Sequence, residues 1–572
     1  MERRHIATVA LEDYFHVGAF NRLIQRGQWN RFETRLERNT DRVLDLLDRH
    51  GVKATFFVLG WVADKHPELV RKVAERGHEL ASKGYYHRSV RQMTREEFSD
   101  DLLRSKAAIE AAAGVGVVGF RMAHEWFQPT DLWALDVLAE CGFKYDSSIA
   151  LIGRDFAHEP WRRFLHKCRT HSGDVWEFPI SSVEWMGLNL PFAGGNWMRQ
   201  MPESVTRRCF AQWTQRHPAP AVLYFHAWEL DPEQPRLNAP SIAARMRHYR
   251  NLGKMEGRLD RLLSQYRFTT AADYLKLPRA PSRVWRPAET KNTAPTMLCL
   301  NRGGKTPVSI VVPCFNEELA LPYLGNTLTG VRERLAEQYD LQFVLVDDGS
   351  SDATWASMQR LFGQARDVKL VRHDVNRGVA AAILTGVRAA DAEIVCSIDC
   401  DCTYDPLELE RMIPMLGDDA AMVTASPYHP LGGVRNVPGW RLFLSRGASW
   451  LYRRTLRSKL ATYTSCFRVY RKSAVAGLQV DEPGFLGVAE ILGRVDLAGG
   501  TIVEFPAVLD SRILGRSKMK TVRTILGHLR LLAKLRWLRW KAAPQTPRTS
   551  TPASSPQQPE LSAPAEEPVG VR

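Results

Sequence analysis

Short apolar runs alternate with amphipathic helical segments along two long stretches of the chain, and this alternation restricts the fold more than any other feature. In residues 1–278 the apolar runs include HIATVAL, KATFFVLGW and AVLYFH. Between them lie segments such as TDRVLDLLDRHG, in which apolar residues recur with a helical period. Strands that alternate with helices are typical of a parallel sheet covered by helices. We therefore predict a β/α barrel over residues 1–278.

A second α/β region follows an aperiodic segment. Residues 279–305 are rich in Pro, Arg, Asn, Thr and Gly and show no periodicity, which predicts a linker. The apolar runs VSIVVPCFNEE, QFVLVDDGS and EIVCSIDCD then predict a doubly wound α/β domain over residues 306–520, with ligands bound at the carboxyl ends of its strands. Residues 542–572 are rich in Pro, Ala, Ser and Thr, so we expect a disordered tail.

The positive charge of the chain is concentrated near its end. Lys and Arg number 78 against 63 Asp and Glu, and residues 512–541 contain ten Lys or Arg with no acidic residue. We predict an amphipathic helix over residues 521–541 that lies on an anionic membrane surface. The alternative is a helix that packs on the second domain with its basic face in solvent. The pattern consists of apolar Val522, Ile525, Leu529 and Leu532, basic Arg523, Arg530, Lys534 and Lys541, and the rings of Trp537 and Trp540.

Other classes of protein are disfavoured by the same composition. No run approaches the roughly 18 apolar residues that span a bilayer, and no nucleic-acid recognition motif accompanies the charge. Nine cysteines form no dense framework, and the opening MERRHIATVALEDYF lacks the long apolar run of a secretory signal. We therefore expect a cytoplasmic protein, peripheral on the inner face of the cell membrane.

Five motifs fall at predicted strand ends of the first region. They are LEDYFHV at 11–17, ASKGYYH at 81–87, GFR at 119–121, YDSSI at 145–149 and YFHAWE at 224–229. In this order they resemble the polysaccharide deacetylase (NodB-homology) family over about residues 5–275. In that family an Asp and two His hold a divalent metal, usually zinc, which lowers the pKa of a bound water to about 7 so that it attacks an acetamido carbonyl.

The resemblance also implies a damaged metal site. Lys83 takes the place of the first His ligand, and an ammonium has three donors and no lone pair. Removing its proton at pH 7 costs about 4.6 kcal/mol from the reference pKa. We expect Lys83 to pair with Glu12 and Asp13 and leave the site without zinc. The family roles fall on Glu12 as the base, Asp13 or Glu12 as the metal carboxylate, His87 as a metal ligand, Arg121 as the residue that orients the base, and His226 as the acid.

Four motifs carry a second resemblance. VVPCFNEE at 311–318, VDDGSSD at 346–352, NRGVAAAILTG at 376–386 and SIDCDCTYDP at 397–406 resemble an inverting family 2 glycosyltransferase of GT-A fold. A nucleotide sugar carries two adjacent anions, and hard carboxylate oxygens suit the Mg or Mn ion that neutralises them. A zinc site on Cys396, Cys400 and Cys402 is disfavoured because no second cysteine pair accompanies them. The resemblance implies Asp399 and Asp401 as metal ligands, Asp347 and Asp348 as nucleoside contacts, and Pro313, Asn316 and Glu317 as the opposite wall.

The acceptor side leaves two possibilities open. Glu490 lies where the family places a carboxylate that acts as a general base on a hydroxyl acceptor, or it is a helix-surface residue. Residues 504–520 resemble the dolichyl-phosphate mannosyltransferase-like branch, in which a phosphate-binding set corresponds here to Arg512, Arg516, Ser517 and Lys518. A polyprenyl-phosphate acceptor already carries an anionic oxygen, and Glu490 would then be dispensable.

These observations together predict a glycosyltransferase of surface polysaccharide or glycolipid assembly. It moves a sugar from a nucleotide sugar to a polyprenyl-phosphate or glycan acceptor, and its N-terminal deacetylase-like domain has a degenerate metal site. One alternative is a bifunctional enzyme with an active metal-dependent N-deacetylase. Another is a glycan-binding scaffold without catalysis.

Overall fold

The computed structural model of the protein describes most of the chain. The predicted linker and tail lie almost wholly outside the described part, as do Arg516, Ser517 and Lys518. The described residues are 3–152, 155–156, 158–239, 241–278, 304–482, 484–515 and 521–542.

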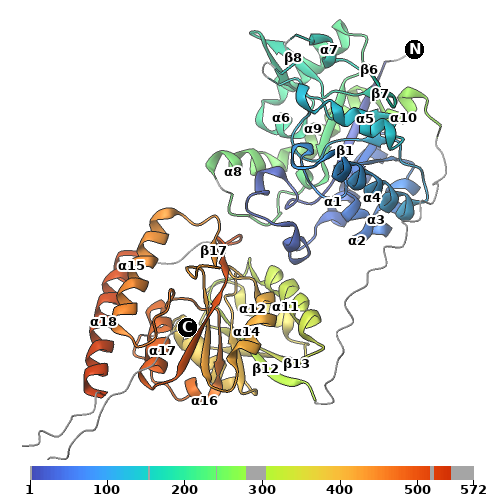
Figure 1. The fold of residues 1–572 in the computed structure, drawn as a ribbon. Coiled ribbons are helices and arrows are strands. Elements are labelled where there is room, and N and C mark those ends of the chain that lie inside the picture. The colour runs from blue at the N-terminus through green and yellow to red at the C-terminus, as the bar shows by residue number, and fades with distance from the viewer. Residues whose placement is uncertain are drawn as a thin grey trace, which may run out of the picture.

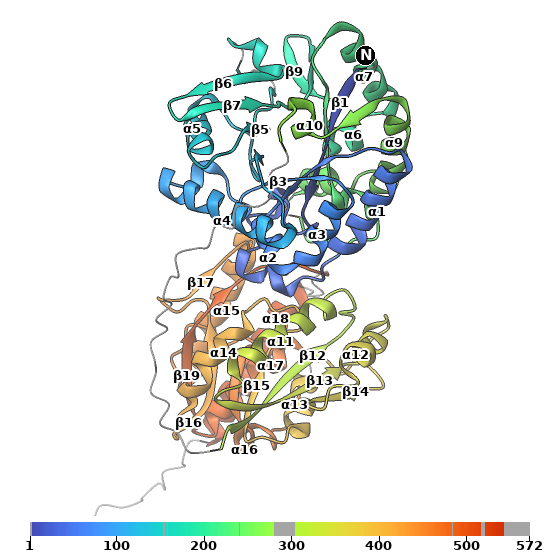
Figure 2. The ribbon, with the colours of Figure 1, turned by 90° about the vertical axis from the view of Figure 1, so that its right-hand side faces the viewer.

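An N-terminal domain, residues 3–278, is built on a nine-stranded sheet (Figures 1 and 2). The strands follow the order β10-β1-β2-β3-β4-β5-β7-β6, and β11 pairs with β1. All neighbours are parallel except β6 and β7, in agreement with the predicted β/α arrangement. The strands are β1 (Arg4–Leu11), β2 (Thr55–Val58), β3 (Glu79–Ser82), β4 (Gly119–Phe120), β5 (Tyr145–Asp146), β6 (His166–Thr170), β7 (Gly173–Glu177), β10 (Val222–His226) and β11 (Arg267–Thr269), with a separate hairpin of β8 (Ser182–Trp185) and β9 (Leu188–Pro191).

Helices pack around this sheet and close its core. In the longest of them, α4, Thr94 and Glu97 form a capping box at the start and Gly114 ends the helix in the left-handed conformation. In the described residues the two ends of the strand path, β10 and β6, are not paired with each other, so the expected barrel is not a closed ring. The helices are α1 (Leu36–Arg49), α2 (Gly60–Lys65), α3 (Pro67–Glu75), α4 (Arg95–Ala113), α5 (Trp133–Glu140), α6 (Gly195–Gln200), α7 (Glu203–Arg216), α8 (Ile242–Tyr249), α9 (Leu252–Gln265) and α10 (Ala271–Leu275).

A C-terminal domain, residues 304–542, has a seven-stranded sheet in the order β14-β13-β12-β15-β18-β16-β19. β18 runs antiparallel to both of its neighbours, and the other pairs are parallel. The first strand continues for nine residues because its apolar run is buried on both faces. The strands are β12 (Thr306–Cys314), β13 (Tyr339–Asp347), β14 (Val368–Arg372), β15 (Ile394–Ser397), β16 (Ala420–Ser426), β18 (Arg468–Arg471) and β19 (Thr501–Pro506), and β17 (Gly433–Val434) pairs separately with β20 (Val508–Leu509).

Eight α-helices are described in this domain. The last of them, α18, packs against α15 and α17 at the side of the domain away from β12 and β13 (Figure 1). No described helix combines the length and the apolar composition that a bilayer crossing requires. The helices are α11 (Leu321–Leu335), α12 (Thr354–Phe362), α13 (Val379–Ala389), α14 (Leu409–Met412), α15 (Gly439–Thr455), α16 (Lys472–Val475), α17 (Phe485–Leu497) and α18 (Thr521–Ala542).

The two domains share one hydrophobic core in addition to their own. Tyr14, Phe15 and Phe32 of the N-terminal domain belong to the same buried cluster as Ile513 and Leu514 of the C-terminal domain. Burial of apolar surface stabilises packing by roughly 25 cal/mol per Å², and the shared cluster stabilises the contact between the two domains in this way. The loops that follow β1 therefore serve as a packing surface for the second domain as well as a border of the first site.

Candidate functional sites

The carboxyl ends of β12, β13 and β15 meet at one edge of the second sheet. β12 lies between β13 and β15, which is a switch point in strand order, and open α/β sheets bind ligands at such points. Asp347 is the last residue of β13, and Asp399 and Asp401 follow the end of β15. The fold thus gathers three of the four aspartates that the motifs single out.

Asp399 and Asp401 form a crowded acidic pair. Burial and the neighbouring Asp401 carboxylate raise the pKa of Asp399 to about 7. Arg512 supplies a counter-charge: its Nε lies 2.6 Å from Asp401 Oδ2 and its Nη1 lies 2.8 Å from Glu317 Oε1. The guanidinium thus bridges the two walls of the site.

The carboxylates of Asp399 and Asp401 fit a hard divalent cation. Mg favours sites in which the protein supplies one or two carboxylates and substrate phosphates supply further oxygens. Burial, and after it the neighbouring Asp401 carboxylate, raises the pKa of Asp399, and a cation bound there would favour the ionised form. Within the described ranges, no group of three or more His, Cys, Asp or Glu side chains is arranged to hold a metal by itself. The cysteines offer no alternative, since burial keeps the pKa of Cys396 and of Cys402 well above the usual thiol value.

The residues that the motifs assign to the nucleoside lie near one another, and Asp348 among them is bound to a neighbouring loop. Asp348 accepts hydrogen bonds from Arg377 N at 2.8 Å, Gly378 N at 2.7 Å and Asn376 Nδ2 at 3.0 Å, and it contacts the His373 ring at 2.8 Å. These contacts saturate its carboxylate. Asp348 therefore fixes the loop at residues 373–378. The motif predicts that this same aspartate contacts the nucleoside.

The remaining wall residues are joined to the loop that follows β13. Asn316 has a left-handed backbone (φ 51°), and its N–H donates to Ser350 Oγ at 2.9 Å. Glu317 N donates to Thr354 Oγ1 at 2.8 Å. Asp347 Oδ2 lies 3.1 Å from Arg372 Nε. Pro313 pairs in register with Val346 of β13, next to Asp347.

Glu490 is buried in α17 and tied to five donors. Its carboxylate accepts from the backbone N–H groups of Asp481 and Glu482, from two nitrogens of Arg494, and from Lys534 Nζ at 2.9 Å. Burial opposes ionisation, but the Lys534, Glu482 and Arg494 hydrogen bonds prevail and lower the pKa of Glu490. A carboxylate held in this way is a poor base, which favours the alternative of a structural role, and the catalytic role of Glu490 stays a prediction. Glu490 joins α17 to α18.

The site of the first domain contains a buried ion pair. Lys83 Nζ donates to Glu12 Oε2, and the two side chains are 4% and 1% exposed. His87 Nε2 lies 3.6 Å from the same oxygen, and His226 Nδ1 lies 3.5 Å from Glu12 Oε1. Burial lowers the pKa of Lys83, and the Glu12 carboxylate opposes this shift. The Lys83 ammonium thus faces the carboxylate and the two histidines that the family motif assigns to metal chemistry.

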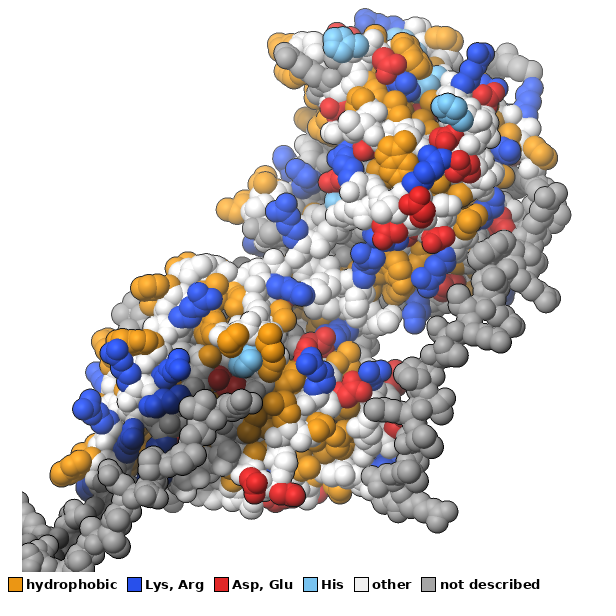
Figure 3. Space-filling view, in the orientation of Figure 1, with side chains coloured by type: hydrophobic (Ala, Val, Ile, Leu, Met, Phe, Trp, Pro, Cys, Tyr) orange, Lys and Arg blue, Asp and Glu red, His pale blue; other side chains and the backbone are white. Residues whose placement is uncertain are grey.

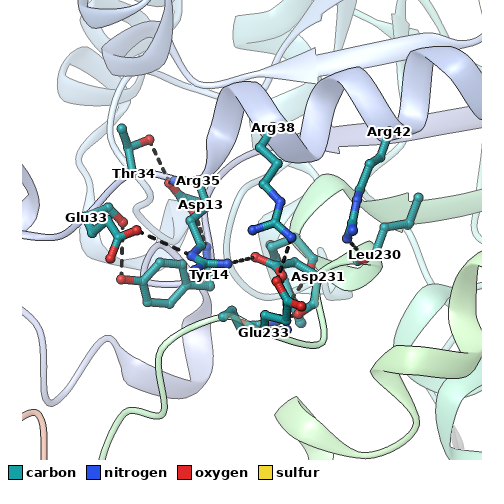
Figure 4. Close-up of polar contacts among 12 residues, drawn as sticks. Asp13, Tyr14, Glu33, Thr34, Arg35, Arg38, Arg42, Leu230, Asp231 and Glu233 are labelled. Carbon is teal, nitrogen blue, oxygen red and sulfur yellow. Dashed lines mark hydrogen bonds and ion pairs between the residues drawn. The ribbon is translucent and has the colours of Figure 1, made fainter. Parts of the chain in front are cut away.

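The Asp13 carboxylate faces Thr34 and Arg35 (Figure 4). It accepts from Thr34 Oγ1 at 2.8 Å, from Arg35 N at 2.8 Å and from Tyr14 N at 3.0 Å. Arg35 in turn reaches Asp231 Oδ2 at 2.9 Å. The expected metal ligation by Asp13 and its pairing with Lys83 are therefore corrected: Asp13 fixes the chain where it enters α1.

Arg121 braces two strands. Its Nη1 donates to Thr8 Oγ1 at 2.9 Å and its Nη2 to Ser147 Oγ at 2.7 Å, while the guanidinium lies over the Phe57 ring. These contacts link β1 to the end of β5. The role of Arg121 in orienting Glu12 stays a prediction.

Two histidines near the ion pair were missed by the sequence reasoning. His16 Nδ1 accepts from Asp13 N at 3.0 Å, and the His124 ring lies 5.8 Å from the His87 ring. His16 stands inside the quoted LEDYFHV motif, so its nearness to Glu12 in sequence was the available signal. His124 offered no comparable signal, because only the fold brings it to His87.

A second surface helix was also missed. Together α15 and α18 present aromatic and basic side chains (Figure 3). The signal in the sequence was the complete lack of Asp and Glu from Ala420 to Val480. The exposed aromatic residues are Trp440, Phe443, Trp450, Trp537 and Trp540, and the exposed basic residues include Arg446, Arg453, Arg454, Arg530, Arg536, Arg539 and Lys541.

The predicted apolar stripe of α18 is divided between two faces. Leu532 is buried with Leu531 and Leu535 against the domain, whereas Leu529 is half exposed. The side chains of Val522 and Ile525 lie outside the described residues. The helix thus packs on the domain and also keeps an outer face.

Three family models match the chain. The polysaccharide deacetylase family matches residues 29–145, a domain of unknown function (DUF3473) matches 147–276, and glycosyl transferase family 2 matches 309–478. Among characterised proteins, polyprenol monophosphomannose synthase of Mycolicibacterium smegmatis is 30% identical over 217 residues, which are 37% of this chain and 80% of that protein. The C-terminal domain is therefore a family 2 glycosyltransferase. The chain belongs to this family and carries a polysaccharide deacetylase domain before it.

Other similar proteins extend the comparison. Dolichol-phosphate mannosyltransferase of Pyrococcus furiosus is 28% identical over 236 residues, 41% of this chain, and the chain spans 64% of the length of that relative. The crystal structure of a polysaccharide deacetylase from Mycobacterium smegmatis aligns with 50% of this chain and 98% of its own at a TM-score of 0.32 and 18% identity. Glucosyl-3-phosphoglycerate synthase of Mycobacterium tuberculosis, solved with Mn²⁺ and UDP-glucose, aligns with 41% of this chain and 80% of its own at 0.31 and 18%.

Proposed function

We propose that the protein transfers a sugar from a nucleotide sugar to a polyprenyl-phosphate acceptor at the inner face of the cell membrane. The observation that carries the proposal is the site in which Asp399, Asp401 and Arg512 meet at the carboxyl edge of the sheet. The 30% identity to a polyprenol monophosphomannose synthase supports the acceptor class.

The residues divide the work of the reaction. Asp399 and Asp401 would hold a Mg or Mn ion, which when bound neutralises charge on the diphosphate. Arg512 offers the same diphosphate a guanidinium that binds phosphate in a bidentate manner. An oxygen of the acceptor phosphate forms the bond to the anomeric carbon, the bond from that carbon to the diphosphate breaks, and the nucleoside diphosphate leaves with the electron pair. The attacking oxygen is already an anion, so the reaction needs no base in the place of Glu490.

The outer face of α15 and α18 supports membrane attachment. Aromatic rings and basic side chains on one face are typical of helices that lie in the plane of an anionic bilayer, and each Lys or Arg near such a surface contributes about 1 kcal/mol. The face extends beyond the single helix that the sequence predicts.

For the N-terminal domain we propose a role without hydrolysis. The ammonium of Lys83 satisfies Glu12 where the family needs a metal ligand, and it repels an incoming dication. The bifunctional enzyme remains the competing proposal, and acetate release together with stoichiometric zinc in the purified chain would favour it.

The transfer itself is tested with the full chain, vesicles that contain polyprenyl phosphate, and a panel of nucleotide sugars. We expect one glycosylated lipid in the mass spectrum, formed only in the presence of Mg or Mn. Hydrolysis of every nucleotide sugar without a lipid product would contradict the proposed acceptor.

A further inference from the structure

A loop of the N-terminal domain, residues 231–238, holds the backbone beside the transferase site. Asn238 Nδ2 donates to Arg512 O at 3.0 Å and to Gly515 O at 2.8 Å. The backbone N–H of Asn238 donates to Ile513 O at 2.8 Å. One residue of the first domain thus satisfies three carbonyl groups within a four-residue segment of the second.

The neighbouring residue adds an apolar contact. Leu237 forms an antiparallel β-bridge with Leu514, and both side chains are buried in the shared core. The N–H of Leu237 donates to Tyr249 Oη at 2.8 Å, which anchors the loop to the end of α8. The segment 512–515 is therefore paired with a strand-like element that belongs to the other domain.

The loop itself is rigidly supported. Gln234 Nε2 donates to Trp228 O at 3.2 Å and to Asp231 O at 2.9 Å, and its Oε1 lies 2.8 Å from His248 Nε2. The rings of Trp228 and His248 stack at 4.3 Å. A buried polar network of this kind specifies one loop conformation when its members are satisfied.

The side chain of the held segment reaches into the transferase site. While its carbonyl accepts from Asn238, the Arg512 guanidinium spans Asp401 and Glu317. Gly515 has a left-handed backbone (φ +73°), and a Cβ placed on it would lie 3.5 Å from Arg512 Nη1. The segment thus turns closely around the guanidinium, and a shift of its backbone moves the charge.

We propose that the deacetylase-like domain is a positioning element of the transferase site, in which Asn238 fixes the backbone of residues 512–515 and thereby sets where the Arg512 guanidinium lies. Asn238 touches no reacting atom and acts only through Arg512. The role of Arg512 toward the diphosphate rests on the proposed function. Catalytic groups need placement within a fraction of an ångström, so a loosened segment lowers the rate.

The test is Asn238→Ala in the full chain. This change removes both side-chain hydrogen bonds and leaves the backbone bond to Ile513. We expect kcat/KM to fall about tenfold, mainly through kcat, as two ordinary neutral hydrogen bonds would predict. If this variant does not fold, Asn238→Gln shifts the amide by one methylene and is expected to show the same direction of change.

The matched control is Asn326→Ala. Asn326 Nδ2, on α11, also donates across the domain interface to two carbonyls, Arg31 O at 3.2 Å and Phe32 O at 3.3 Å, but neither carbonyl belongs to the segment 512–515. We expect its kcat/KM to remain within about twofold of the unmodified protein. Equal losses in both variants would mean that the interface only stabilises the fold, and the proposal would be overturned.

A double variant tests whether Asn238 acts through the Arg512 side chain or through the stability of the whole protein. In an Arg512→Ala background we expect Asn238→Ala to change the residual rate by less than about twofold, because the positioned side chain is gone. A full tenfold loss on that background would overturn the proposal.

The result can be distinguished from failure of the proposed function. If the unmodified chain transfers no sugar to polyprenyl phosphate, the proposed function fails, and positioning is then measured as the affinity for UDP and GDP with Mn²⁺ by calorimetry. We expect Asn238→Ala to bind about tenfold more weakly, since Arg512 would contact the diphosphate, and Asn326→Ala to bind as the unmodified chain does. Equal affinities in all three proteins would overturn the inference.

Discussion

Each of the two sites of this protein pairs a carboxylate with a basic side chain, but the two pairs differ in access. In the N-terminal domain Lys83 and Glu12 are 4% and 1% exposed. In the transferase domain Arg512 is 23% exposed, and it divides its guanidinium between Asp401 and Glu317. In the buried pair, Lys83 and Glu12 neutralise each other, so neither side chain needs a ligand. A more accessible guanidinium on two acids can exchange one of them for a phosphate.

The largest effect is expected for Asp401→Asn. Loss of this charge removes the counter-ion for the leaving diphosphate, and we expect transfer to fall about a thousandfold with the fold intact. The matched control is Asp405→Asn, four residues away, where the carboxylate faces Arg31. A steady-state assay in Mg, Mn or chelator measures both. Unchanged turnover of Asp401→Asn would remove the proposed metal role.

The buried pair is broken by Lys83→Met. This change leaves Glu12 buried without its partner, and we expect a loss of about 3 kcal/mol in the free energy of unfolding, measured in urea. The double variant Lys83→Met/Glu12→Gln is expected to recover most of the loss, since no buried charge remains. If the single variant is as stable as the unmodified chain, Lys83 and Glu12 do not form the pair in solution.

The same position also tests metal chemistry. Lys83→His supplies a neutral nitrogen ligand beside His87 and Glu12, and we expect zinc affinity to rise at least about tenfold in calorimetry. The unmodified chain is expected to hold no stoichiometric zinc and to release no acetate from N-acetylated oligosaccharides. Zinc retained by the unmodified chain, with acetate release, would make the N-terminal domain a deacetylase.

Glu490→Gln separates structure from catalysis in the transferase domain. Because Lys534 and Arg494 lose a charged acceptor, we expect a loss of about 2 kcal/mol in stability. Transfer to polyprenyl phosphate is expected to change less than about threefold at a temperature where the variant is folded. A hundredfold loss of rate with unchanged stability would restore Glu490 as the base.

The smallest effect concerns the surfaces of the two domains. Trp537→Ala/Trp540→Ala removes two exposed rings from α18, and we expect binding to anionic vesicles to weaken about tenfold. Added salt should weaken the binding of the unmodified chain. Trp185→Ala, an equally exposed ring of the N-terminal domain, is the control in co-sedimentation. Equal binding by all three proteins would exclude α18 from the membrane contact.

Much of the architecture was predictable because it depends on local patterns. The buried apolar runs of β12, β13 and β15 predicted the parallel sheet, and the acidic residues after β15 predicted the place of Asp399 and Asp401. The substitution at Lys83 predicted a basic side chain paired with Glu12 and Asp13, and the structure pairs Lys83 with Glu12. These inferences required only the period of the sequence and the chemistry of the side chains.

Other assignments depended on which partners the fold supplies. Asp13 and Glu12 are adjacent in sequence, but successive side chains of an extended chain point to opposite sides, so only one of them reaches Lys83. The sequence made Glu490 a candidate base. The structure shows that Lys534 of α18, 44 residues later in the chain, donates to its carboxylate. The periodicity of apolar residues in a sequence does not indicate contacts between residues so far apart.

The sequence by itself determined two α/β domains, the acidic transferase edge and the replacement of a metal ligand by Lys83. Only the tertiary structure decided that Asp348 fixes the loop 373–378 and that α15 and α18 share one face. It also decided that Asn238 donates hydrogen bonds to the backbone of residues 512–515. The physical reason is that local periodicity and residue chemistry are written in neighbouring residues. Contacts between residues tens or hundreds of positions apart exist only after the chain has folded and the two domains have packed against each other.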